Sequence, residues 1–161
     1  MRETVTAGEI EITRIYDAPR ELVWRAWTEP ERLSRWWGKR GWSTPLASIT
    51  MDVRPGGAFR LTSVRDQDGQ EMTQDATYRE VVPPERLVFT QDARADGRAF
   101  AHGTVTFSDL GGGRTAMRFR MTTHASDAIR EAAANGLASA FDRLGEHLAG
   151  PRPTTNQGAR P

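Results

Sequence analysis

Residue types that commonly perform catalysis or bind metals are few and scattered in this chain of 161 residues. The three histidines, His102, His124 and His147, lie far apart, and no two have the i, i+4 spacing of a helical metal site. The absence of cysteine excludes disulfides, thiol nucleophiles and thiolate metal ligands. No serine lies in a Gly-x-Ser-x-Gly turn. The sequence therefore predicts neither a metal site nor a catalytic triad, and it indicates no obligatory cofactor.

Three polar residues are candidates for the wall of a pocket. Alternate residues of a strand share a face, so Asp75 and Arg79 face inward if Val81 does, and Gln91 faces inward if Phe89 does. A polar group on the core side costs free energy unless it is paired or hydrated, as it is in a ligand pocket. The alternative is that the strand ends are exposed, or that a β-bulge shifts the phase.

Four of the five tryptophans lie between Trp27 and Trp42. A soluble chain seldom leaves so much aromatic surface in water, so these rings either fill a core or line an apolar ligand site. Trp24 and Trp27 repeat at helical spacing, which favours the core. Trp36 and Trp37 are adjacent and cannot both point the same way, so one of them is expected at a cavity mouth. The residues that this interpretation brings together there are Trp36, Trp37, Trp42, Met51 and Phe59.

Apolar periodicity predicts the elements that position these residues. Residues 9–16 alternate apolar and polar, which indicates a strand with one buried face. A short helix over 20–27 follows, and then a second with Thr28 as N-cap and Pro30 in its first turn. Six further strands are predicted in hairpins, over 46–53, from 59 onward, and over 73–82, 87–91, 100–107 and 115–122.

A long amphipathic helix is predicted to follow the strands. Ser126 is its expected N-cap, and Gly150 with Pro151 stops it near residue 149. Its inner stripe includes Gly136 and several alanines, which cannot fill the space beneath a helix as Leu or Phe would. Either the helix packs closely on the sheet or a cavity remains. Residues 150–161 are predicted to form a disordered tail.

These elements describe an α+β fold, in which a curled antiparallel sheet of about seven strands surrounds one long helix. Residues 1–149 suit a single domain. The last strands and the long helix are expected to line the cavity with Met117, Phe119, Gly136, Leu137, Ala140 and Phe141. One large side chain, such as Phe141 or Met117, would be enough to fill that cavity.

Several motifs, in this order along the chain, resemble a known family. They are Ala18-Pro19, Val23-Trp24-Arg25-Ala26, Trp36-Trp37-Gly38, Asp52-Val53-Arg54-Pro55-Gly56-Gly57, Pro83-Pro84-Glu85-Arg86-Leu87, Gly136, Asp142-Arg143-Leu144 and Glu146-His147-Leu148. The chain resembles the activator of heat-shock protein 90 ATPase homologue family, within the START-like (SRPBCC) superfamily, over about residues 13–148. Leu137 stands where the family commonly has a tryptophan, which changes the shape of the pocket. The resemblance implies a helix-grip fold whose cavity often holds a hydrophobic small molecule.

Composition excludes several partners. The chain has 22 Lys and Arg against 21 Asp and Glu, so it lacks the basic excess of a nucleic-acid binder. It has no signal-peptide pattern and no apolar segment long enough to cross a bilayer. We therefore expect a cytoplasmic protein that binds no nucleic acid and does not insert into a membrane.

Three functions remain open. The first is binding of a hydrophobic or aromatic small molecule, such as a lipid, between the last helix and the sheet. The second is a cofactor-independent enzyme, cyclase-like, aromatase-like or hydrolytic, in which Asp75 or Arg79 polarises an enol or carbonyl of an aromatic or polyketide-like substrate. The third is a co-chaperone-like interaction module with a chaperone partner. The resemblance implies no single activity, because the superfamily includes lipid and hormone binders, polyketide cyclases and co-chaperone domains.

Overall fold

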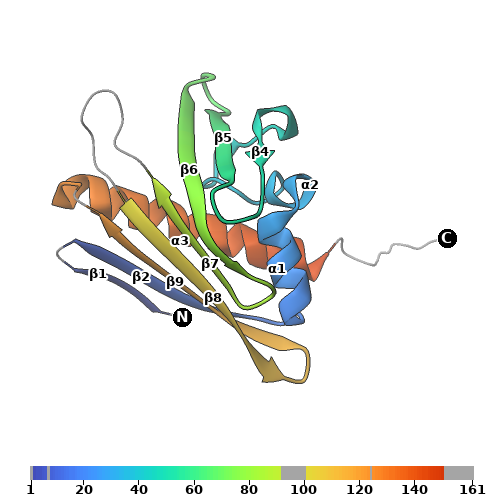
Figure 1. Cartoon of the computed structure of the whole chain (residues 1–161). Coiled ribbons are helices and arrows are strands. Elements are labelled where there is room, and N and C mark those ends of the chain that lie inside the picture. The colour runs from blue at the N-terminus through green and yellow to red at the C-terminus, as the bar shows by residue number, and fades with distance from the viewer. Residues whose placement is uncertain (1, 7, 92–100, 124, 151–161) are drawn as a thin grey trace.

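One antiparallel sheet forms most of the computed structural model, which describes residues 2–6, 8–91, 101–123 and 125–150 (Figure 1). Within these residues the sheet has nine strands in the order β1-β2-β9-β8-β7-β6-β5-β3, and β4 also pairs with β5. The strands are β1 (Arg2–Thr6), β2 (Glu9–Tyr16), β3 (Trp42–Ser43), β4 (Thr50–Met51), β5 (Ala58–Arg65), β6 (Glu71–Val82), β7 (Arg86–Gln91), β8 (Ala101–Gly111) and β9 (Arg114–Thr123).

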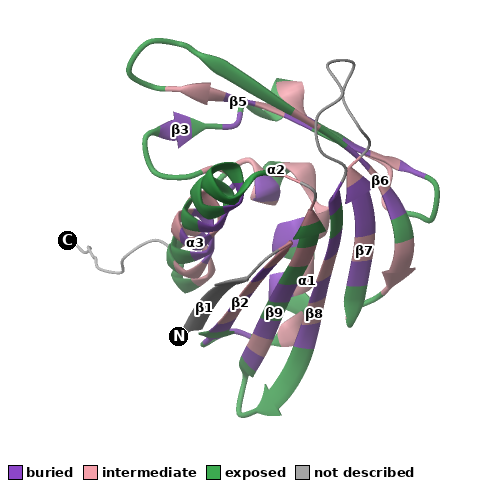
Figure 2. Cartoon of the chain, turned by 90° about the vertical axis from the view of Figure 1, so that its left-hand side faces the viewer, coloured by how far each residue is buried: buried purple, intermediate pink, exposed green. Residues whose placement is uncertain are grey.

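The helices lie on the concave side of this sheet. They are α1 (Arg20–Thr28), α2 (Pro30–Leu33) and the long α3 (Asp127–Ala149). Figure 2 shows the sheet curling around α3, with β1 and β2 on one side of the helix and β3 and β5 on the other. The predicted α+β architecture, two short helices and a curled antiparallel sheet around a long helix, is confirmed.

The ends of α3 are the ones that the sequence predicts. The Ser126 side chain accepts a hydrogen bond from the Ile129 backbone N–H (3.3 Å), which satisfies a donor that the first helical turn leaves free. At the other end Gly150 adopts a φ of 77°, a conformation that L side chains rarely adopt. Residues 151–161, for which a disordered tail is predicted, lie outside the described residues.

The core lies beneath the C-terminal half of α3. Trp27, Trp36 and Phe141 are at most 1% exposed, and the Trp27 ring centroid lies 5.1 Å from that of Trp36 and 6.0 Å from that of Phe141. Both indole N–H groups have acceptors: Trp27 donates to the Met117 sulfur (3.3 Å), and Trp36 donates to the Ala26 carbonyl (3.0 Å). Aromatic rings with satisfied polar edges therefore fill this half of the interface between helix and sheet.

The prediction that Thr28 caps the second helix is wrong. α1 continues through Thr28, whose hydroxyl donates to the Trp24 carbonyl (2.9 Å) inside the same helix. Glu29 takes the N-cap position of α2 instead, and Pro30 follows it in the first turn. A threonine that bonds back to the preceding turn is not available as a cap.

The predicted strand over 46–53 is also wrong in most of its length. Leu46–Ser48 is a 3₁₀ helix, and only Thr50–Met51 pairs with β5. Pro45 fixes its own φ, and the Ser48 hydroxyl donates to the Pro45 carbonyl (2.8 Å), so local bonds replace the ladder. The structure adds two edge strands that were not predicted, β1 and β3, which bring the total within the described residues to nine instead of about seven.

Candidate ligand cavity

A cavity of about 690 Å³ lies between the sheet and the N-terminal half of α3. This volume is within the usual range of small-molecule sites, roughly 300–1,000 Å³. Two apolar residues that line it, Ile129 of α3 and Met72 of β6, are 47% and 45% exposed, so the cavity opens to solvent. Most of the other lining residues are apolar, as expected for a site that holds an apolar molecule.

Small residues of α3 create this space. Ala132, Ala133, Gly136 and Ala140 all line the cavity. A Cβ atom built on Gly136 would meet only one atom within 4 Å, the Lys39 side-chain Cδ at 3.9 Å. The helix therefore leaves room above the sheet here, whereas Phe141 and Leu144 close that room one to two turns later.

Two tryptophans form part of the opposite wall. Trp37 is 7% exposed, its indole N–H donates to the Gln74 side-chain oxygen (3.0 Å), and its ring meets Phe59 edge-on at 5.8 Å. Trp42 carries two cations over its ring, Lys39 Nζ at 5.9 Å and Arg65 Cζ at 5.7 Å from the centroid. These contacts orient both rings.

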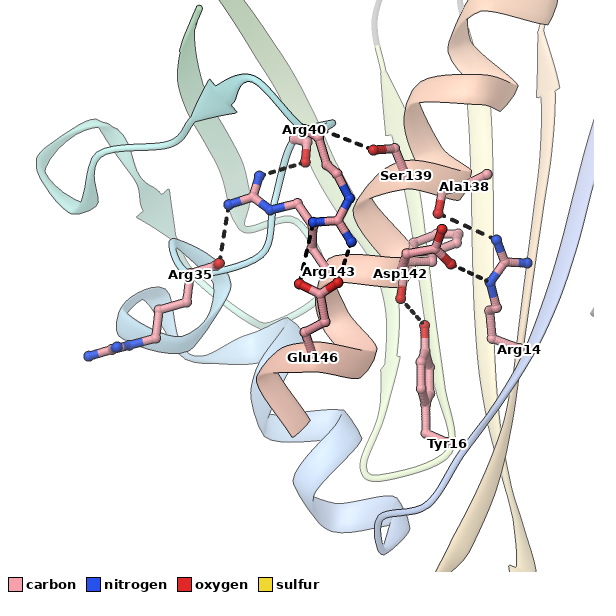
Figure 3. Close-up of polar contacts among 11 residues, drawn as sticks. Arg14, Tyr16, Arg35, Arg40, Ala138, Ser139, Asp142, Arg143 and Glu146 are labelled. Carbon is pink, nitrogen blue, oxygen red and sulfur yellow. Dashed lines mark hydrogen bonds and ion pairs between the residues drawn. The ribbon is translucent and has the colours of Figure 1, made fainter. Parts of the chain in front are cut away.

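Arg143 of α3 holds the loop that carries these tryptophans (Figure 3). One of its terminal nitrogens donates to the carbonyls of Trp37 (3.3 Å), Gly38 (2.8 Å) and Trp42 (3.1 Å). The other donates to the Arg35 carbonyl (3.3 Å). Burial lowers the pKa of the Arg143 guanidinium, and Arg40 beside it acts in the same direction. Four carbonyls of one loop thus depend on one side chain of the helix.

Arg40 makes a second connection between the loop and α3, at the surface. Its backbone N–H donates to the Ser139 hydroxyl (2.9 Å), and its guanidinium forms an ion pair with Glu146. The hydrogen bond from Arg40 lowers the pKa of the Glu146 carboxyl. Both side chains are exposed, so solvent screens this pair and it stabilises the loop less than Arg143 does.

On the other side of α3, β2 supplies two buried polar contacts (Figure 3). The Tyr16 hydroxyl donates to the Phe141 carbonyl (2.9 Å), and burial raises the pKa of this phenol well above its usual value. Arg14 donates to the Ala138 carbonyl (3.4 Å) and lies 3.5 Å from the Asp142 carboxylate. The C-terminal half of α3 is therefore held by side chains from both flanks, and the space beneath its other half is kept open.

Eight of the fourteen residues expected at a ligand site line the cavity. They are Trp37, Trp42, Phe59, Gln91, Phe119, Gly136, Leu137 and Ala140. Trp36, Met117 and Phe141 belong to the filled core instead, and each is fully buried. Met51 lies in β4, pairs with Phe59 and is not part of the lining.

The predicted inward orientation of Asp75 and Arg79 is wrong. The register between β6 and β7 shifts after Tyr78, which lies opposite Phe89. This bulge reverses the alternation of inward and outward side chains, so residues before it that are an even number of positions from Val81 face outward. Asp75 is exposed and lies 3.4 Å from Arg60 on the outer face. Arg79 is exposed and donates to the Thr90 hydroxyl (2.9 Å). The bulge, which was the alternative interpretation, thus removes both residues from the cavity.

Sequence reasoning missed several polar residues of the lining, among them Lys39, Gln74 and Arg130. Gln74 had a signal, because it alternates with Ala76 and Tyr78, which face inward. Lys39 and Arg130 had none, since a charged residue beside an apolar stripe usually faces water. Among the described residues no group of three or more His, Cys, Asp or Glu side chains is placed to hold a metal ion. His102 lies on β8 and His147 on α3, and His124 lies outside the described residues.

The curled sheet, the long helix on its concave face and the cavity between them define a helix-grip protein of START-like fold. The family model described as Activator of Hsp90 ATPase homolog 1-like protein matches residues 17–149, and the chain belongs to this family. No curated protein matches the chain significantly. Within the described residues, no helix has the length and apolar character needed to cross a bilayer.

Solved structures share the fold. A protein of Chromobacterium violaceum is 26% identical, with a TM-score of 0.78 over 88% of this chain and 96% of that one. A protein of Rhizobium leguminosarum is 28% identical, with a TM-score of 0.72 over 92% and 99% of the two chains. A solution structure from Arthrobacter aurescens is 21% identical, with a TM-score of 0.80 over 99% and 98%. The helix-grip fold implied by the sequence motifs is confirmed.

Proposed function

We propose that this protein binds a hydrophobic or aromatic small molecule in the cavity between α3 and the sheet. The observation that carries the proposal is the open, mostly apolar cavity of about 690 Å³ beneath Gly136 and its neighbouring alanines. Trp37 and Trp42 line the cavity, and their rings are oriented by contacts with Gln74 and with Lys39 and Arg65. A site organised in advance loses less conformational entropy on binding.

A neutral environment-sensitive dye, N-phenyl-1-naphthylamine, tests this proposal by fluorescence titration. We expect the wild-type protein to bind the dye and apolar compounds to displace it. Gly136→Phe places a ring in the cavity and is expected to weaken dye binding about tenfold or more. Asn135→Phe is the matched control, because Asn135 is exposed on the same helix and does not line the cavity.

Two results would contradict the proposal. One is that no dye binds and no apolar compound in a broad panel is retained when the purified protein is examined by native mass spectrometry. The other is that Gly136→Phe and Asn135→Phe bind the dye equally well while both remain folded in a thermal melt. In either case the cavity would not be the binding site.

The two alternative functions, an enzyme and a chaperone-binding module, have different support. The enzyme hypothesis relied on Asp75 or Arg79, and the outer positions of both residues remove them as groups that polarise a substrate in the cavity. Chaperone binding is suggested by the family description alone. Micromolar capture of a chaperone by the purified protein, unchanged by Gly136→Phe, would favour that alternative over the small-molecule proposal.

A further inference from the structure

Arg130 is a buried cation in the wall of the cavity. It lies in the first turns of α3, it is 6% exposed, and it belongs to the lining. One terminal nitrogen donates to the Asp127 carboxylate (2.7 Å). Its Nε is buried and, among the described residues, has no hydrogen-bond partner. A buried N–H without an acceptor costs free energy, so this edge of the guanidinium is suited to a partner that the protein itself does not supply.

Asp127 pairs with only one nitrogen of the Arg130 guanidinium. The Asp127 side chain is 92% exposed, whereas the Arg130 side chain is 7% exposed, so the carboxylate approaches the guanidinium from the solvent side. Solvent screens such a pair and weakens it. A guanidinium has five N–H donors in a planar fork, and the contact with Asp127 engages only the outer terminal nitrogen.

The charge of the lining favours an anion. Lys39 and Arg130 both line the cavity, and none of its described lining residues is Asp or Glu. Most of the other residues of the lining are apolar, among them Met121 and Ile129. An ion pair formed next to such side chains is screened less than one at the surface.

We propose that the occupant is an amphipathic acid, whose apolar body fills the cavity and whose carboxylate accepts hydrogen bonds from the Arg130 guanidinium. Arginine and carboxylate match as a planar pair, and a charge-assisted pair of this kind is stronger than a neutral hydrogen bond. The inference rests on the proposed function, because it specifies the head group of a ligand in the same cavity. It predicts discrimination between an acid and its ester, which differ in charge and share the apolar body.

The test uses 11-(dansylamino)undecanoic acid and its methyl ester in fluorescence titrations at neutral pH. We expect the wild-type protein to bind the acid about tenfold more tightly than the ester. Arg130→Gln is expected to abolish this preference by weakening the acid and leaving the ester within about twofold. Arg118→Gln removes the same charge from the outer face, where Arg118 pairs with Glu11, and is expected to leave the preference unchanged.

A second variant keeps Arg130 in place, in case Arg130→Gln does not fold. Asp127→Asn releases the outer nitrogen of Arg130 and is expected to increase the preference for the acid, while binding of the ester stays the same. A preference that is unchanged or lower in Asp127→Asn contradicts the inference. So does a preference that disappears in Lys39→Gln and persists in Arg130→Gln.

The outcomes separate this inference from the proposed function. If the wild-type protein binds acid and ester equally, the carboxylate site is wrong and the apolar cavity still binds ligands. If it binds neither probe, the proposed function itself fails. Binding of the acid with a preference that depends on Arg130 supports both.

Discussion

The C-terminal half of α3 presents Phe141 and Leu144 to a core of aromatic rings, whereas the N-terminal half presents alanines and Gly136 to a cavity. The same sheet faces both halves. The difference comes from side-chain volume, since large residues on one half exclude solvent and small residues on the other leave space. Close packing and a cavity are therefore both present along one helix, and the two halves differ, because one fills the space above the sheet and the other leaves it open.

The largest effect is expected from Phe141→Ala. Removing a fully buried ring from the filled half is expected to lower the free energy of unfolding by about 3–5 kcal/mol. Leu137→Ala, in the cavity half, is expected to cost about 1 kcal/mol or less, because Leu137 already borders open space. Urea denaturation of both variants measures the difference. Equal losses would mean that the two halves are not packed differently.

Arg143→Met is expected to affect both halves. Methionine keeps much of the apolar stem and removes the donors to the carbonyls of Trp37, Gly38, Trp42 and Arg35. We expect a loss of about 1–2 kcal/mol, since Arg143 is partly exposed, together with weaker dye binding as the tryptophan wall loosens. Arg40→Met, which removes an exposed pair, is the control and is expected to change dye binding little. Unchanged dye binding in Arg143→Met would show that the wall does not need this residue.

Tyr16→Phe is expected to lower stability by about 1 kcal/mol without altering dye binding, because the lost hydrogen bond lies over the filled half. Its pH dependence gives an independent check. Burial raises the pKa of Tyr16 above its usual value of 10.0, so the unfolded chain ionises first and wild-type stability falls as pH rises above about 10. Tyr16→Phe should reduce that fall in urea midpoints measured from pH 8 upward. An identical pH profile in the variant would contradict the assignment.

The smallest expected effect is an increase in stability instead of a loss. Gly136→Ala adds a methyl group where only the Lys39 side chain lies within 4 Å, so the gain in helix propensity of about 0.5–1 kcal/mol is expected to appear in full. Gly145→Ala, in the filled half, brings the new methyl to 3.4 Å from the Tyr16 ring and should gain less. Thermal melts of the two variants measure this pair. A larger gain at Gly145 would reverse the proposed contrast.

Local patterns were sufficient for the elements that depend on near neighbours in the sequence. Ser126 and Gly150 predicted the two ends of α3, and Gly136 with its neighbouring alanines indicated the position of the cavity. Aromatic clustering correctly predicted that Trp37 and Trp42 line the cavity. It also predicted Trp36 there, which instead lies in the core and donates its indole N–H to a carbonyl of α1. Which of two adjacent rings faces the core is decided by packing and not by spacing.

The errors occurred where one residue or one distant partner decides the outcome. A single extra residue in β6 reverses the faces of Asp75 and Arg79, and alternation alone cannot detect it. The motif that contains Arg143 does not reveal its hydrogen bonds, because the acceptors lie more than 100 residues away. Arg130 breaks the rule that charged residues face water, and exceptions of this kind are expected at binding sites.

The hydrogen bonds that Arg143 makes between the tryptophan loop and α3 would also limit the size of a molecule that enters the cavity. Since the tryptophan loop is bonded to α3 itself, the wall and the helix cannot separate without losing hydrogen bonds to four carbonyls. A molecule that fits the existing space meets no such resistance. A bulkier one would have to break these bonds or displace the helix from the aromatic core, so under the proposed function this single guanidinium would set the greatest width of ligand that the cavity accepts.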